Sequence, residues 1–273
     1  MYSDVVDLRD FYATSLGQVA IRMIRRRIRL IWPDLAGMRL LGMGYAVPYL
    51  RPFREEAERT LAVMPSLQGV LSWPAEGPNV VALAEEAELP FDDSSMDRIL
   101  LIHAVESSEQ VRPLLKEVWR VLTGAGRVLI VVPNRRGIWA RLDRTPFGLG
   151  HPYTPGQLSR LLREEMFTPV RSETALFIPP VRTRMMLGSA PAWEKLGERW
   201  FTRFAGVAVI EAAKQIYARP SPKKARRQRV YVPLPQPIIP THAHFDDGVN
   251  HFFRDGIVKQ YCRPRPDSSA SGL

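Results

Sequence analysis

Gly42 and Gly44 lie where a predicted strand gives way to a predicted helix, within RLLGMGYAVPYL at residues 39–50. Glycine at such a turn has no side chain, so backbone amides can come close to a bound ligand. A Gly-x-Gly pair by itself is a weak signal, and its meaning depends on the surrounding elements. We expect Gly44→Val to abolish ligand binding and to leave the fold largely intact, because a β-branched side chain would block this approach.

His103 directly follows the apolar residues of another predicted strand, 98–102. Ligands of an open α/β sheet bind outside the carboxyl ends of its strands, so His103 could orient a substrate or accept its proton. The alternative is a packed or capping histidine without a chemical role. The five histidines and one cysteine show no metal-ligand spacing, and therefore no zinc site is expected.

The elements that would position these residues alternate between strands and helices. A helix over 49–59 should follow the glycine turn, and Thr154 with Pro155 marks the start of a later helix. This order predicts an α/β fold with a mostly parallel sheet and helices on both faces. The other expected helices cover 110–122 and 193–200, and the expected strands cover 38–42, 61–64, 80–82, 98–102, 128–132, 169–177 and 206–212.

A dinucleotide-binding oxidoreductase is the first alternative for such a fold. Its signature needs a third glycine in G-x-G-x-x-G and an acidic residue after the second strand. Val47 stands where that glycine should be, and residues 62–64 carry no carboxylate. Both departures argue against this interpretation.

The segment EVWRVLTGAGRVLIVVPN, residues 117–134, is the most specific motif in the chain. It resembles the late helix-turn-strand of class I methyltransferases that use S-adenosylmethionine, especially those related to quinone-biosynthesis C-methyltransferases, whose turn reads roughly RVLKPGG. Thr123 and Ala125 depart from that pattern. The resemblance covers residues 35–217 and implies a Rossmann-like, seven-stranded, mostly parallel sheet. The matching residues are Arg120, Val121, Leu122, Gly124 and Gly126.

The same resemblance implies the contacts to S-adenosylmethionine. The family's loop reads D-x-G-x-G-x-G, and here Gly42 and Gly44 match, whereas other loop positions depart from it. Met64 or Pro65 falls where relatives have a ribose-binding acid. Glu85, in LAEEAELPF, matches the acid that accepts a hydrogen bond from the adenine amino group. The alternative for Glu85 is a solvated surface carboxylate.

The acceptor site follows from the resemblance as well. The long connection at 133–158 contains Trp139, His151 and Tyr153, and the corresponding region of the family shapes the acceptor pocket. The alternative is a loop that only packs on the core. The resemblance implies a methyltransferase with a small-molecule acceptor. His103 would be its catalytic residue because of its position after a strand. Leu40 and Ala46 replace an acid and a glycine of the family loop, which leaves a catalytically degenerate binding or regulatory module as the main rival.

Composition supports a folded domain with appendages. A chain of 273 residues with 45% hydrophobic content can bury a full core. Its single cysteine cannot form an intramolecular disulfide, and its acidic start does not resemble a secretory signal. No apolar run approaches the roughly 20 residues that span a bilayer. We therefore expect a cytoplasmic protein without a membrane span.

The net charge of +10 is unevenly distributed. Arginines between residues 22 and 29 alternate with apolar residues as in a basic amphipathic helix, either packed with a solvated basic face or turned to a membrane or nucleic acid. The Pro-rich end contains KKARRQR, which could bind RNA in an RNA methyltransferase, although no aromatic residue interleaves it for stacking. The expected organisation is a helical arm at 1–34, a methyltransferase-like domain at 35–218 and a basic extension at 219–273.

Overall fold

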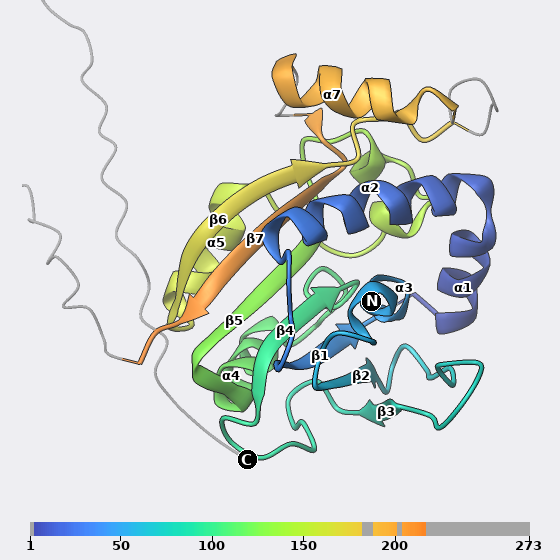
Figure 1. Ribbon diagram of the computed structural model, residues 1–273. Helices are drawn as coiled ribbons and strands as arrows, with labels where there is room; N and C mark the ends of the chain where they lie inside the picture. Colours follow the sequence, from blue (N-terminus) through green and yellow to red (C-terminus); the bar gives the residue numbers. More distant parts are fainter. Residues whose placement is uncertain (1–2, 182–187, 201–203, 217–273) are drawn as a thin grey trace, which may run out of the picture. The chain divides into compact units, whose positions relative to one another are not determined.

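The computed structural model describes residues 3–181, 188–200 and 204–216. Seven strands form one sheet in the order β3-β2-β1-β4-β5-β7-β6 (Figure 1). Neighbouring strands run parallel except around β7, which is antiparallel to both β5 and β6. This confirms the predicted seven-stranded, mostly parallel sheet. The strands are β1 Arg39–Gly44, β2 Arg59–Pro65, β3 Val81–Ala84, β4 Met96–Ile102, β5 Leu122–Pro133, β6 Phe167–Ala175 and β7 Val207–Lys214.

Helices cover the two faces of this sheet because strand side chains alternate between them. Leu129 and Val131 of β5 share one apolar cluster with the helices α1 and α2. Val128 and Ile130 belong to a second cluster, with α4 and α5. The helices are α1 Val5–Ala13, α2 Ser15–Ile31, α3 Val47–Leu50, α4 Val111–Val121, α5 Pro155–Glu164 and α7 Ala190–Trp200, and the short 3-10 turns are η1 Arg51–Phe53, η2 Trp139–Arg141 and η3 Pro146–Gly148.

The start of α5 follows the sequence prediction closely. Thr154 is its N-cap and accepts a hydrogen bond from the Gln157 backbone N–H, while the Gln157 side chain accepts one from the Thr154 N–H. Pro155 occupies the first helical position, where a backbone N–H would have no hydrogen-bond partner within the helix. This reciprocal capping fixes where the connection after β5 ends.

The helix predicted over residues 49–59 is much shorter in the structure. The α3 helix and the η1 turn end at Phe53, and β2 already begins at Arg59. Pro52 explains the early end, because it has no N–H to donate to the Pro48 carbonyl four residues earlier. Arg25 of α2 donates its Nη2 hydrogen to that carbonyl instead, at 2.5 Å.

The basic segment of the arm is confirmed as an amphipathic helix, α2. Ile24 and Ile28 are fully buried against the sheet, whereas Arg22 and Arg26 are exposed. The arm therefore shares the core of the domain that follows it. The extension at 219–273 lies outside the described residues, and the domain limits stay predictions. Within the described part, no helix combines the length and the apolar character needed to cross a membrane.

Candidate functional site

The strand order reverses between β1 and β4, which lie side by side at the centre of the sheet. From β1 the chain proceeds outward to β2 and β3, and from β4 it proceeds the other way to β5. Open α/β sheets bind ligands at the carboxyl ends of the strands beside such a reversal. We call the carboxyl ends of β1, β2, β3 and β4 the carboxyl edge. Gly44 and His103 both lie on it.

Gly42 and Gly44 are both buried, and each is required by the packing of the turn. Gly44 has a φ of +74°, and a Cβ there would lie 2.3 Å from the Ile102 carbonyl oxygen. A Cβ at Gly42 would lie 2.6 Å from Leu50 Cδ1. The expectation that Gly44→Val spares the fold was therefore wrong, because any side chain at Gly44 collides with the backbone of β4.

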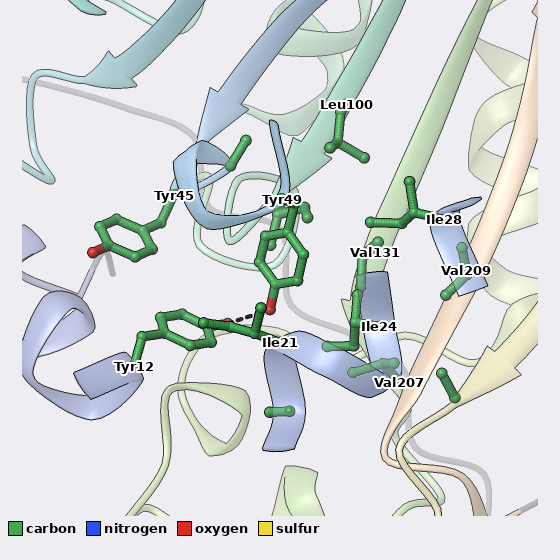
Figure 2. Close-up of a cluster of buried hydrophobic side chains, with 14 of the residues drawn as sticks. Tyr12, Ile21, Ile24, Ile28, Tyr45, Tyr49, Leu100, Val131, Val207 and Val209 are labelled. Atoms are coloured by element: carbon green, nitrogen blue, oxygen red, sulfur yellow. Dashed lines mark hydrogen bonds between the residues drawn. The ribbon is translucent and has the colours of Figure 1, made fainter. Parts of the chain in front are cut away.

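His103 lies inside a chain of buried hydrogen bonds. Its Nε2 is 2.7 Å from the Tyr12 hydroxyl, and its Nδ1 is 3.1 Å from Glu106 Oε1. Tyr49 donates its hydroxyl hydrogen to the Tyr12 oxygen at 3.0 Å, which Figure 2 shows as a dashed line. The Tyr12 ring also stacks on Tyr45, the residue after Gly44. The network thus joins α1, the glycine turn and the end of β4.

Burial keeps the two phenols of this network protonated. It raises the pKa of the Tyr12 hydroxyl well above its usual range, and the nearby Tyr49 hydroxyl and Glu106 carboxylate add to this. Burial also raises the pKa of Tyr49. Both phenols therefore keep their protons, so Tyr49 donates to Tyr12 and Tyr12 donates to His103 Nε2. A histidine that accepts at Nε2 carries its proton at Nδ1, from which it donates to Glu106.

The backbone at His103 is unusual, with a φ of +53°. A residue with a Cβ rarely adopts this left-handed region, and doing so costs about 1–3 kcal/mol. Such strain occurs often at functional sites. The sequence placed His103 correctly at the end of β4 but gave no sign of Tyr12, which is 91 residues away along the chain. Glu106 was missed as well, although its spacing from His103 is short enough to have suggested a pair.

The predicted cofactor residues on β2 and β3 lie in different surroundings. Glu85 directly follows β3, is exposed, and accepts a hydrogen bond from Ser66 Oγ at 2.6 Å. It therefore lies on the carboxyl edge, and its contact with adenine stays a prediction. Met64 is 1% exposed, and its side chain belongs to the apolar core, so it offers no polar contact there.

Gln68, in the loop after β2, is a candidate that sequence reasoning missed. Its side chain is 1% exposed, and neither its amide oxygen nor its amide nitrogen has a hydrogen-bond partner among the described residues. Glu106 Oε2 is also buried without a partner there. Buried polar groups of this kind are rare in folded proteins, and each one calls for an explanation.

The three residues predicted to bind the acceptor do not lie together. His151 and Tyr153 line a pocket of about 390 Å³ with Arg135. The His151 backbone N–H donates to the Glu106 carbonyl at 2.7 Å, which ties this pocket to the His103 network. Trp139 is instead a core residue, 1% exposed, whose indole N–H donates to the Ile178 carbonyl at 2.7 Å. Its predicted contact with an acceptor has no support in this arrangement.

A second pocket, of about 340 Å³, lies between the arm and the glycine turn. Tyr12 and Tyr45 line it together with Arg9, Arg25 and Arg51. Arg25 is half-buried, and burial together with the neighbouring Arg51 charge lowers its pKa, partly offset by Tyr49. The pocket is therefore electropositive and adjoins the His103 network through Tyr12.

Comparisons with known proteins agree with this architecture. Residues 41–130, from β1 into β5, match the family model of a methyltransferase domain. This part of the chain therefore resembles a methyltransferase domain in sequence. No curated protein sequence matched.

Solved structures of methyltransferases resemble this chain in fold. One is an S-adenosylmethionine-dependent enzyme of Thermotoga maritima described as a possible histamine N-methyltransferase, at 15% identity and a TM-score of 0.53 over 77% of this chain and 96% of that one. Another is the complex of a putative methyltransferase with the Trm112 activator of Haloferax volcanii, at 14% identity and 0.52 over 78% and 93%. A third, from Archaeoglobus fulgidus, has 19% identity and a TM-score of 0.50 over 70% and 93%. At these identities the likeness extends to the fold alone, and the quinone-related subtype stays a prediction.

Proposed function

We propose that this chain transfers a methyl group from S-adenosylmethionine to a small-molecule acceptor. The observation that carries the proposal is the glycine turn at the strand reversal, within a segment that matches a methyltransferase model. The orphaned buried polar atoms of Gln68 and Glu106 fit a polar ligand at the same edge. The bound cofactor would supply a methyl group already activated on a sulfonium.

The protein's own task in such a reaction is mostly alignment. Well-oriented reactants gain on the order of 7–11 kcal/mol from positioning, more than one acid or base usually adds. The turn at Gly42 and Gly44 would offer its backbone to the cofactor, and Glu85 would accept a hydrogen bond from the adenine amino group. Glu85 suits this role because its carboxylate is exposed at the end of β3.

His103 is the proposed catalytic residue. Its Nε2 accepts a hydrogen bond in the structure, and its Nδ1 is held by Glu106, so the imidazole has a fixed orientation and tautomer. A histidine held in this way can orient an acceptor hydroxyl or amine and take its proton at Nε2. The acceptor would enter by the pocket of His151 and Tyr153, which adjoins Glu106.

The class of function is tested by ligand titration. Purified protein is titrated with S-adenosylmethionine, S-adenosylhomocysteine and NADH in a calorimeter. We expect the first two to bind and NADH not to bind. Binding of NADH alone would replace the methyltransferase with the oxidoreductase interpretation.

Turnover is tested separately, with methyl-labelled cofactor and a small-molecule extract. Label in any product would show that the protein catalyses methyl transfer, and the labelled product would identify the acceptor. The rival is a domain that binds the cofactor without turnover, and the burial of Gly44 and His103 is the observation that favours it. Tight binding without label in any extract would support that rival.

A further inference from the structure

Helix α1 lies along the carboxyl edge where the cofactor should bind (Figure 1). At one end, the Val5 backbone N–H donates to the Gln68 carbonyl, in the loop after β2, at 2.9 Å. At the other end, Tyr12 contacts His103 at the end of β4. Val5 and Tyr12 are separated by about 10 Å of helix rise. The helix therefore extends from the end of β2 to the end of β4.

The side of α1 that faces the edge is apolar and fully packed. Val5, Leu8 and Tyr12, spaced by three and four residues, are its buried side chains. Val6 and Asp7 on other sides of the helix are exposed. The apolar contacts of α1 with the domain are therefore made by one narrow stripe.

Two buried polar side chains near α1 have atoms without a hydrogen-bond partner. Gln68 has both amide atoms unpartnered at one end of the helix, and Glu106 has Oε2 unpartnered at the other, beyond His103, among the residues that the structure describes. Both side chains are 1% exposed. An amide and a carboxylate that are buried in this way have lost water and gained no hydrogen bond for these atoms in return.

We propose that Gln68 and Glu106 are cofactor contacts, and that α1 occupies the cofactor's place until it is displaced. The inference rests on the proposed function. An amide can both donate to and accept from the hydroxyls of a nucleoside sugar, and a carboxylate can bind the ammonium of an amino acid. S-adenosylmethionine carries both groups, with the ribose hydroxyls in its middle and the ammonium at its amino-acid end.

The connection between α1 and α2 permits such a movement. Thr14 alone joins them, in an extended conformation with φ −71° and ψ 158°. Its backbone N–H caps α1 and its side chain caps α2. One side-chain hydrogen bond, from the Gln18 amide of α2 to the Tyr12 carbonyl at 2.7 Å, also joins the helices and would have to break. Rotation at Thr14 would carry Tyr12 away from His103, and Nε2 would then face the ligand.

A reversible cross-link tests whether α1 must move. A Cβ at Gly69 would lie 3.9 Å from Val5 Cβ, close to the separation of about 3.8 Å in disulfides. The variant Val5→Cys with Gly69→Cys, in a Cys262→Ser background, should form a disulfide that holds α1 in place. We expect the oxidised form to bind S-adenosylhomocysteine at least 100-fold more weakly than its reduced form.

The controls separate the possible failures. The single variant Gly69→Cys measures the effect on binding of backbone strain at Gly69, whose φ is +84°. The pair Val6→Cys with Gly69→Cys is a control in which the thiol of residue 6 lies on an exposed side of α1. Equal affinity of the oxidised and reduced locked forms would overturn the proposal and leave the proposed function standing. Failure of the Cys262→Ser parent to bind the cofactor would instead contradict the proposed function itself.

A second variant tests the polar contacts without moving α1. Gln68→Leu keeps the size of the side chain and removes an unpaired amide, so the free protein should melt at the same or a higher temperature. Its affinity for S-adenosylhomocysteine should fall at least tenfold. Glu106→Gln should weaken binding similarly, with Glu109→Gln, at an exposed position, as its control. A lower melting temperature with unchanged affinity would make Gln68 a structural residue and overturn its assignment.

Discussion

The two ring nitrogens of His103 are both engaged, one by Tyr12 and one by Glu106. The histidine can therefore act on an acceptor only when Tyr12 releases Nε2. His103→Ala should leave the affinity for S-adenosylhomocysteine within a fewfold and lower methyl transfer by about 10²-fold or more. Single-turnover rates and calorimetry measure the two effects. Normal transfer by the variant would remove His103 from the chemistry.

Tyr12→Phe distinguishes a catalytic from a covering role for Tyr12. The change removes the hydroxyl that bonds to His103 and keeps the ring that stacks on Tyr45. If Tyr12 only helps to hold α1, cofactor affinity should rise and transfer should not fall. A loss of transfer as large as that of His103→Ala would instead make the Tyr12 hydroxyl part of the reaction.

Glu85 can be tested by its contribution to cofactor affinity. Loss of a hydrogen bond that involves a charged group costs about 1.5–3 kcal/mol. Glu85→Ala should therefore weaken binding of S-adenosylhomocysteine by roughly ten- to a hundredfold. Glu88→Ala, also exposed in the same acidic run, is the control. A shift below twofold, or an equal shift in both variants, would make Glu85 an ordinary surface carboxylate.

At the scale of elements, α2 supports the short helix after the glycine turn. Arg25 donates to the Pro48 carbonyl, to which Pro52 has no N–H to donate. Arg25→Met should lower the free energy of unfolding by about 1–3 kcal/mol, because the carbonyl loses its partner. Arg22→Met, on the exposed side of the same helix, should change it by no more than about 0.5 kcal/mol. Urea unfolding of the two variants measures the difference, and equal values would show that the Arg25 bond adds nothing.

Sequence prediction succeeded for some elements and failed for others, depending on whether neighbouring residues or distant contacts determine the structure. Thr154 and Pro155 correctly predict the start of α5, because helix capping depends on residues that are adjacent in the sequence. The helix predicted over residues 49–59 ends early at Phe53, because Pro52 has no N–H to donate to the Pro48 carbonyl. At the site, His103 could be placed from the end of a strand, whereas Tyr12 and Gln68 depend on how α1 packs across the edge. Such packing depends on contacts between segments far apart in the chain, which no local pattern specifies.

At the scale of the whole molecule, the end of β7 is anchored to the rest of the fold by Lys214 and Gln215. The Lys214 ammonium donates to the Leu122 carbonyl at 2.6 Å and lies 4.1 Å from the centre of the Trp119 ring. The Trp119 indole N–H donates to the Gln215 carbonyl at 3.3 Å. These contacts tie the end of β7 to α4 and to the start of β5, and they require the chain only as far as Gln215.

Removal of everything after Ala218 should therefore leave a domain that unfolds cooperatively. Its free energy of unfolding should match that of the full chain within about 0.5 kcal/mol, since the hydrogen bonds described above for Lys214 and Gln215 remain. A chain ending at Ala213 should lose about 1–3 kcal/mol, because the Leu122 carbonyl and the Trp119 indole lose their partners. Urea unfolding of the three forms measures this. If ending the chain at Ala218 costs as much stability as ending it at Ala213, the basic extension itself stabilises the fold.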